Sequence, residues 1–344
     1  MINTMKYLSI FVCLALLITS IVFLPFETDS KITAGKGNGK NEKIEEPEDF
    51  LEFLTHFTGN DPIDMRNDKI TFLSYADEDT TEENEKTNKH KYESVTMHES
   101  THMANYSSST YDNSTYSSSQ TISRQLSIYM TQNASYYHTI GQIKASQTND
   151  SIQGADGNYQ LYIDFDIEIY IDNEDDILYI KFNSWDMISS SETTIISNEI
   201  LGKWVYLGSY SYELLDFVDD MNRDALKQFG SIIEDAIDDN LFDKNKGQYS
   251  LNKKGLKEAL GFEDLDKGNF LVDMSDSESP IIDMHLGTSS KSDSSTDSKY
   301  SSSYYIDSKM VFENINNTIV EMDEDVDILE IDEDDIEDYF IVED

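Results

Sequence analysis

The feature that most limits the fold is a strict alternation of apolar and more polar residues from Tyr159 to Ile171. A β-strand points successive side chains to opposite faces, so this pattern predicts a long strand with one apolar face and one mainly acidic face. The run Asp172 to Asp176 predicts a turn, and Ile177 to Phe182 predicts a strand that returns beside the first.

Weaker strand patterns lie on both sides of this hairpin, and together they predict an antiparallel meander with one face in water. They span residues 126–130, 136–143, 203–207, 281–286, 309–312, 318–322 and 326–331. Two Ser/Tyr-rich stretches, residues 106–119 and 288–305, read instead as low-complexity segments.

The clearest helical pattern runs from Tyr212 to Ile237, where apolar residues recur at steps of three and four. Such a stripe predicts an amphipathic helix that packs on the open face of a sheet. A short strand at 249–251 and a second short helix from Lys253 to Leu260 follow, and Glu45 to Phe57 predicts a helix near the N-terminus. The predicted fold class is α+β: a curved antiparallel sheet, or half-barrel, with an inserted amphipathic helix pair on its apolar face.

The N-terminal residues predict export. Lys6 precedes twenty uncharged residues, Tyr7 to Phe26, which as a helix are long enough to span a bilayer. The positive charge before the span predicts that the N-terminus stays inside and the body lies outside. We expect a retained membrane anchor rather than a cleaved signal peptide, with secretion as the alternative if cleavage occurs. Cys13 lies within the span but lacks the small preceding residue of a lipidation box.

The charge of the chain limits the kinds of partner that it can bind. The formal net charge is −43, from 68 acidic and 25 basic residues. A surface this negative repels phosphate backbones, so we expect no nucleic-acid partner. It suits solubility, multivalent cations or a basic surface partner. The single cysteine, Cys13, leaves the exported body without disulfides, so packing must hold it together.

We divide the chain into four parts on composition. Residues 1–26 form the signal peptide or anchor, and residues 27–91 form an acidic linker with a short helix, flexible from 27 to 43. The half-barrel domain covers residues 92–331. The remaining residues, 332–344, form an acidic tail; 14 of the last 24 residues of the chain are Asp or Glu.

One motif raises the alternative of an enzyme. His98, Glu99 and His102 match the H-E-x-x-H signature of zinc metallopeptidases, in which both histidines of a helix bind one zinc and the glutamate activates water. On a strand the two histidines would lie roughly 13 Å apart, too far to share a metal. The segment is rich in modest helix formers, and no glutamate lies between Glu99 and Glu168 to serve as a third ligand. We therefore expect a strand, no catalytic residue and no cofactor, with zinc as the alternative.

Two acidic patterns suggest calcium less strongly. The run Asp243 to Leu251 resembles an EF-hand loop but lacks the closing glutamate, so we interpret it as a turn into a strand. Asp164, Asp166 and Glu168 line one strand face beside the turn 172–176 and could bind calcium weakly. Our preferred interpretation is a solvated strand face.

The order of the elements resembles a known class. A meander is followed by GKWVYL at 202–207, a long helix, GQYSLNKKGL at 247–256 and the strand pair MVFENINNTIVEM at 310–322. This order is similar to the lipoprotein-carrier half-barrel class of exported bacterial proteins, over roughly residues 92–331. The resemblance implies a concave apolar face that holds a lipid or another apolar ligand. The lipid-attachment cysteine of that class is missing here, as is the proline often found just after the last paired strands.

The sequence therefore predicts an exported, non-catalytic protein of the cell surface, membrane-anchored or secreted, that binds a lipid or other apolar ligand. The alternatives are a zinc metallopeptidase that uses the HESTH motif and an acidic structural surface protein with no small ligand.

Overall fold

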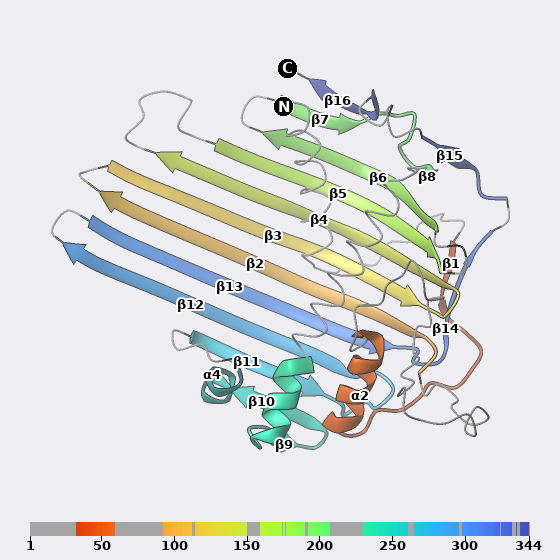
Figure 1. Cartoon of the computed structure of the whole chain (residues 1–344), viewed down its shortest axis with the longest axis horizontal. Helices are drawn as coiled ribbons and strands as arrows, with labels where there is room; N and C mark the ends of the chain where they lie inside the picture. The colour runs from red at the N-terminus through yellow and green to blue at the C-terminus, as the bar shows by residue number, and fades with distance from the viewer. Residues whose placement is uncertain are drawn as a thin grey trace, which may run out of the picture.

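The computed structural model describes residues 32–58, 92–111, 114–149, 159–173, 175, 177–189, 192–206, 230–260, 265–295, 298–323, 325–331, 335 and 338–343. These residues form one open sheet of 14 strands and a separate two-stranded sheet (Figure 1). The main sheet runs in the order β15-β8-β6-β5-β4-β3-β2-β13-β12-β11-β10-β9; off this path β7 pairs with β6, and β16 pairs with β7. Within the described chain its pairs are antiparallel except for β15 with β8.

The main sheet is built on seven long strands, and its other elements are short. The long ones are β2 (Val95–Tyr111), β3 (Ser114–Met130), β4 (Ala134–Asn149), β5 (Tyr159–Asp172), β6 (Ile177–Ser189), β12 (Ile281–Ser295) and β13 (Ser298–Glu313). The short strands are β7 (Glu192–Ile196), β8 (Trp204–Tyr206), β9 (Asp243–Asn245), β10 (Gln248–Asn252), β11 (Leu265–Asp273), β15 (Ile328–Glu330) and β16 (Phe340–Glu343). Because β13 pairs with β2, the two meanders join into one surface.

The predicted two-faced strand is confirmed in β5. Ile163, Phe165, Ile167, Ile169 and Ile171 are buried and point to one face of the sheet. The partner strands β4 and β6 continue the same alternation, because each residue pairs with one that faces the same way. We call this the apolar face and the opposite one the outer face.

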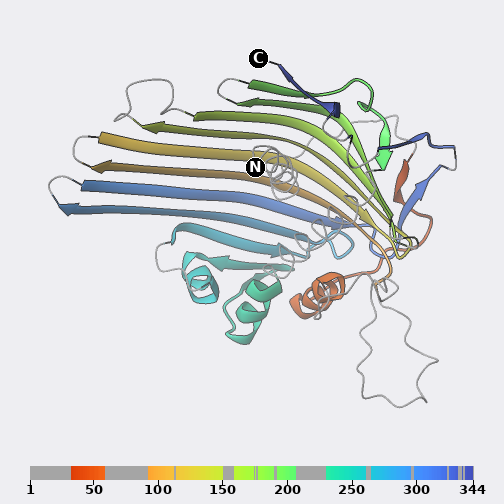
Figure 2. The ribbon, with the colours of Figure 1, turned by 45° about the horizontal axis from the view of Figure 1, so that its top comes forward.

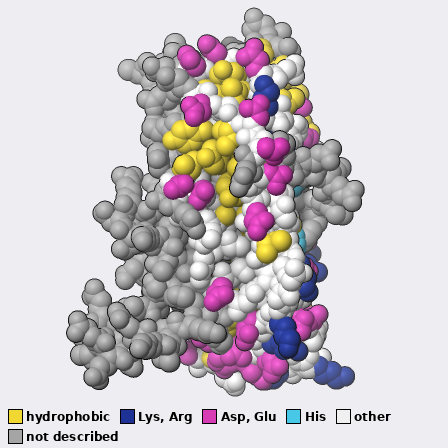
Figure 3. Space-filling view, turned by 90° about the vertical axis from the view of Figure 1, so that its right-hand side faces the viewer, with side chains coloured by type: hydrophobic (Ala, Val, Ile, Leu, Met, Phe, Trp, Pro, Cys, Tyr) yellow, Lys and Arg dark blue, Asp and Glu magenta, His cyan; other side chains and the backbone are white. Residues whose placement is uncertain are grey.

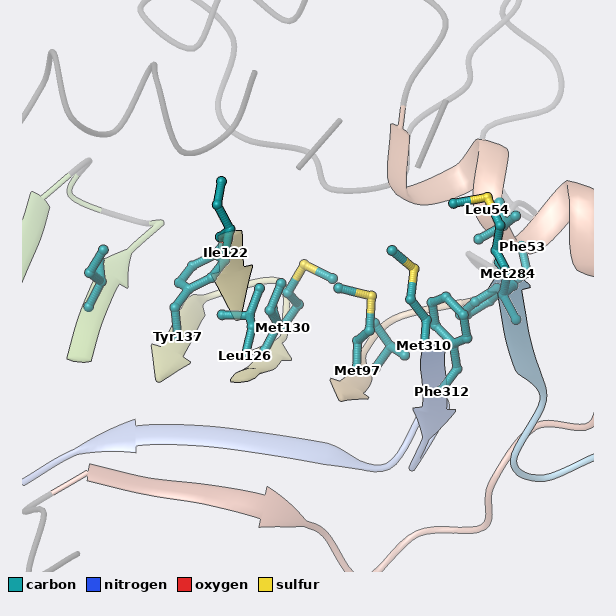
Figure 4. Close-up of a cluster of buried hydrophobic side chains, with 14 of the residues drawn as sticks. Phe53, Leu54, Met97, Ile122, Leu126, Met130, Tyr137, Met284, Met310 and Phe312 are labelled. Carbon is teal, nitrogen blue, oxygen red and sulfur yellow. The ribbon is translucent and has the colours of Figure 1, made fainter. Parts of the chain in front are cut away.

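Helices cover one end of the apolar face. The helix α2 (Pro47–Thr58) and the helix at residues 230–238 lie on that side of the sheet, as does α4 (Lys253–Leu260) (Figure 2). Phe50 and Phe53 of α2 are fully buried, and both rings meet the ring of Phe312 edge-on at 5.4 Å. Figure 4 shows Phe53 and Phe312 together with a row of methionines beside them, which includes Met97 and Met310.

The outer face has a smaller apolar cluster of its own. The strands β1 (Ile32–Lys36) and β14 (Thr318–Met322) pair with each other, and Ile32 and Val320 pack with Tyr136, Tyr170 and Trp204. Residues 32–36, which we expected in a flexible linker, are therefore a strand. The expectation was wrong because the contacts that stabilise β1 come from β14, whose residues lie almost 300 positions away in the sequence.

The described residues of the two Ser/Tyr-rich stretches, which we interpreted as low-complexity segments, form strands. They form the far ends of β2, β3, β12 and β13, which pair with the next strand in continuous register apart from a shift between Asp293 and Ser295. Serine hydroxyls bond across the strands, as in Ser107 with Ser118 and Ser290 with Ser302, both at 2.8 Å. Part of the expected acidic tail is ordered as well, because β16 pairs with β7.

Two local predictions can be compared directly with the structure. The second short helix, α4, has the bounds that the sequence predicted, and Asn252 Oδ1 caps it by accepting from the Lys254 and Gly255 amides at 2.9 and 3.2 Å. Of the longer helix expected over Tyr212 to Ile237, residues 212–229 lie outside the described residues. The segment Tyr7 to Phe26 also lies outside them, and no helix in the described part of the chain is long and apolar enough to span a membrane.

Gly141 allows close packing at the centre of the sheet, and its replacement provides a test of the register. A Cβ at this position would lie 2.5 Å from Ser123 O, 2.8 Å from Phe165 Cζ and 2.9 Å from Arg124 Cα. We expect Gly141→Ala to lower the free energy of unfolding by about 1–3 kcal/mol, measured by urea denaturation. The control is Gly287→Ala on β12, whose Cβ would meet nothing closer than 3.7 Å. Equal effects of the two substitutions would contradict the packing described here.

Candidate functional site

The HESTH motif lies on strand β2, as expected from its composition. The strand divides the motif between the two faces of the sheet. Glu99 belongs to the apolar face with Met97 and Thr101, whereas His98 and His102 alternate with them on the outer face. Glutamate and histidines are therefore separated by the sheet itself.

The two histidines each have a partner on β3. His98 Nδ1 lies 2.9 Å from Ser127 Oγ, and His102 Nδ1 lies 2.9 Å from Ser123 Oγ. Burial lowers the pKa of His98, which keeps its imidazole neutral at physiological pH. Four residues of strand separate the side chains by roughly 13 Å, so they cannot bind one metal ion together. The helical presentation that a zinc peptidase of this type requires is not formed by these residues.

Glu99 instead belongs to a buried polar group on the apolar face, which we call the polar cluster: Glu99, Thr101, Arg124 and Ser308. The Glu99 carboxylate lies 3.7 Å from the Arg124 guanidinium, and their side chains are only 12% and 2% exposed. Thr101 Oγ1 lies 3.3 Å from Glu99 Oε1 and donates to Ser308 Oγ at 2.7 Å. Ser308, Thr101 and Arg124 are successive partners across β13, β2 and β3.

Apolar side chains surround the polar cluster. Met97, Ile122, Leu126 and Met310 are buried next to it on the same face and point to the same side of the sheet (Figure 4). Burial raises the pKa of Glu99 to about 7 although Arg124 opposes the shift, and burial lowers the pKa of Arg124 to about 9. The cluster can therefore offer hydrogen bonds and a charge in surroundings that otherwise favour hydrocarbon.

The acidic row of β5 is only partly solvated, which corrects one interpretation. Glu168 is fully buried, accepting from Lys181 Nζ at 2.9 Å, Asn183 Nδ2 at 2.7 Å and Tyr136 OH at 2.7 Å. Asp166 Oδ1 lies 2.9 Å from His138 Nε2. Both oxygens of Glu168 are engaged by side chains, so this carboxylate is a structural ion pair rather than a free calcium ligand.

The EF-hand-like run is a β-hairpin. Strands β9 and β10 pair across Lys246 and Gly247, whose φ angles are 50° and 82°. Two positive φ angles in a two-residue loop are typical of the tight turn that matches strand twist. The expected turn into a strand is confirmed.

Acidic side chains are also exposed at one end of the molecule (Figure 3). Figure 3 shows the end of the molecule that carries β1 and β14, where acidic side chains are scattered around hydrophobic ones. Such a surface agrees with the charge of −43 but indicates no single binding site by itself.

In comparisons with known proteins, no family model, no curated protein and no solved structure matches the chain.

Sequence reasoning missed Arg124 and Ser308 as site residues. The signal for Arg124 was available, because it interrupts the alternating apolar series Ile122, Leu126, Ile128. Ser308 offered no such signal, since its proximity depends on the pairing of β13 with β2.

The raised pKa of Glu99 predicts a pH-dependent stability. The folded protein binds this proton more tightly than the unfolded chain, whose carboxyl has the ordinary value of 4.5. The stabilising contribution is therefore complete below pH about 4.5 and is lost as the pH rises through about 7. We expect Glu99→Gln to remove up to about 3 kcal/mol of pH dependence between pH 4.5 and 8, measured by urea denaturation across that range.

The matched control for this experiment is Glu321→Gln, because Glu321 is exposed on β14. It should leave the pH profile of the wild-type protein unchanged. Identical profiles for the wild type and Glu99→Gln would contradict the assignment.

Proposed function

We propose that this chain is an exported, non-catalytic protein of the cell surface that binds a lipid or another apolar ligand on the apolar face of its sheet. In this proposal the sheet is a half-barrel, and an amphipathic helix pair packs on its concave face. The body lies outside the membrane. It is either anchored there through Tyr7 to Phe26 or secreted after this segment is cleaved. The order of elements that resembles the lipoprotein-carrier half-barrel class supports this proposal.

The observation that carries the proposal is the polar cluster within the apolar face. A face that served only as a core would gain more stability from apolar residues, since a buried ion pair is often no better than its hydrophobic replacement. Thr139, buried on the same face, has a hydroxyl with no hydrogen-bond partner in the described part of the chain. A ligand with an apolar body and a polar end would match this combination.

The alternatives differ in what they need from the structure. The zinc-peptidase alternative needs His98, Glu99 and His102 on one face, whereas strand β2 distributes them over two. The third hypothesis, an acidic structural surface protein with no small ligand, is favoured by the net charge of −43. It differs from the carrier proposal in predicting no apolar ligand.

Ligand binding is tested by introducing one charge on either face of the same strand. Met103 is partly buried in the apolar core and its neighbour His102 lies half-buried on the outer face. We expect Met103→Glu to weaken binding of a fluorescent fatty acid by about tenfold or more, because a carboxylate is costly in an apolar site. His102→Glu should leave the affinity unchanged, with circular dichroism confirming that both variants fold.

Lipids that copurify with the wild-type protein, identified by mass spectrometry after organic extraction, would identify the ligand class. Failure of the wild-type protein to bind or copurify with any apolar ligand would reject the carrier proposal and favour the structural one.

Export is tested separately in bacterial cells that express the full chain. We expect protease added to intact cells to digest the body while a cytoplasmic marker survives. Deletion of residues 7–26 should protect the body, because the apolar span directs it across the membrane. A body that is protected in both forms would show that the span does not export it.

A further inference from the structure

A group of potential metal ligands lies on the outer face, next to His102 of the HESTH motif and on the opposite side of the sheet from the polar cluster. Asp283 and His285 occupy β12 two residues apart, so their side chains share a face, and Asp307 is the direct partner of His285 on β13. His285 Nε2 lies 3.1 Å from Asp283 Oδ1, and His285 Nδ1 lies 2.8 Å from Asp307 Oδ1. One candidate ligand atom from each residue lies within 4.8 Å of the other two.

The three side chains stand on a rigid part of the molecule. Met284 and Leu286 flank His285 along the strand and are buried on the apolar face. Packing of these neighbours holds the backbone of β12 in place, and fourteen of the fifteen residues of β12 pair with β13 in a ladder with one shift, between Asp293 and Ser295. Tyr305 OH donates to Asp307 Oδ2 at 3.2 Å, which orients this carboxylate and leaves Oδ1 toward the imidazole. Sites built on strands hold their ligands more precisely than sites on loops.

We propose that Asp283, His285 and Asp307 bind a divalent transition-metal ion, with zinc as the best match. The set contains one imidazole nitrogen and two carboxylate oxygens, and both ligand types bind zinc at about 2.0–2.2 Å. Ligand atoms around one ion must therefore lie within about 4 Å of one another. The three half-exposed side chains reach this spacing when side-chain rotation moves their ligand atoms closer by about 1 Å. Imidazole favours zinc over calcium and magnesium, which prefer oxygen alone.

The surroundings both favour and limit the site. The net charge of −43 raises the concentration of cations near the surface. Exposed Lys309 is the register partner of Asp283 on β13 and offsets part of this attraction. His102 is the register partner of Asp307 on β2, but its Nδ1 contacts Ser123 on the opposite side. Three protein ligands leave the remaining positions of the metal to water.

Isothermal titration calorimetry of the full chain with zinc chloride tests the proposal, using protein that carries no polyhistidine tag. We expect one equivalent of zinc to bind the wild-type protein. His285→Ala should weaken binding by more than about tenfold, the smallest loss typical of removing even an outer partner of a ligand. The matched control is the double variant His98→Ala/His102→Ala, which removes both motif histidines and should bind zinc as the wild type does.

A second variant guards against misfolding. Asp283→Asn/Asp307→Asn keeps the size of both side chains and should lose zinc binding while circular dichroism and the melting temperature without metal stay unchanged. Three results would overturn the proposal. One is a wild-type protein that binds no stoichiometric zinc. Another is binding that survives His285→Ala at full strength. The last is binding lost in the His98→Ala/His102→Ala variant and retained in His285→Ala, which would return the site to the HESTH motif.

Discussion

The register of the long strands is the constraint on which the rest of the structure depends. Side chains alternate between the faces, so a slip of one residue would exchange the two faces of a whole strand. For β3, a slip would move Ile122 and Leu126 into water and bring Ser123 and Ser127 into the apolar core. The close approach at Gly141 belongs to the same constraint, because Phe165 and the β3 backbone fill the place of a side chain in only one register.

A buried ion pair on each face favours this register over alternative pairings of the strands. Glu99 and Arg124 meet on the apolar face, and Glu168 and Lys181 meet on the outer face beneath the β1–β14 pair. A buried charge whose partner is removed costs several kcal/mol, whereas the intact pair adds little stability. The two ion pairs therefore destabilise alternative strand registers more than they stabilise the correct register. The same reasoning applies to Asn183, the extra residue at the β5–β6 bulge. Its side-chain amide donates to both Asp166 and Glu168, and another register would remove these hydrogen bonds.

The sequence predicted those parts of the fold whose signal is local. The alternation in β5, the cap and length of α4 and the β9–β10 turn all follow from neighbouring residues. The Ser/Tyr-rich strand ends and β1 did not, because their stability comes from partners in distant strands. The motif 98–102 was predicted correctly to form a strand. The contact of Glu99 with Arg124 was not predicted, because it depends on the pairing of β2 with β3. The pair Asp283 and His285 lay within a predicted strand, but Asp307 joins them only through the pairing of β12 with β13.

Separation by the sheet also allows the two faces to act independently. Met284 and Leu286 contribute to the apolar core, while His285 between them points to the outer face. The ligand that we propose for the apolar face would lie on the side of Met284 and Leu286 and could not reach His285, because the hydrogen-bonded backbone of β12 lies between them. Movement of a side chain on one face can therefore reach the other face only through a shift of the β12 backbone, which the ladder from β11 to β13 restrains from both sides. Substitutions among the acidic residues of the exterior can thus leave the packing around Glu99 and Arg124 unchanged, because strand register keeps the two sets of side chains on opposite faces.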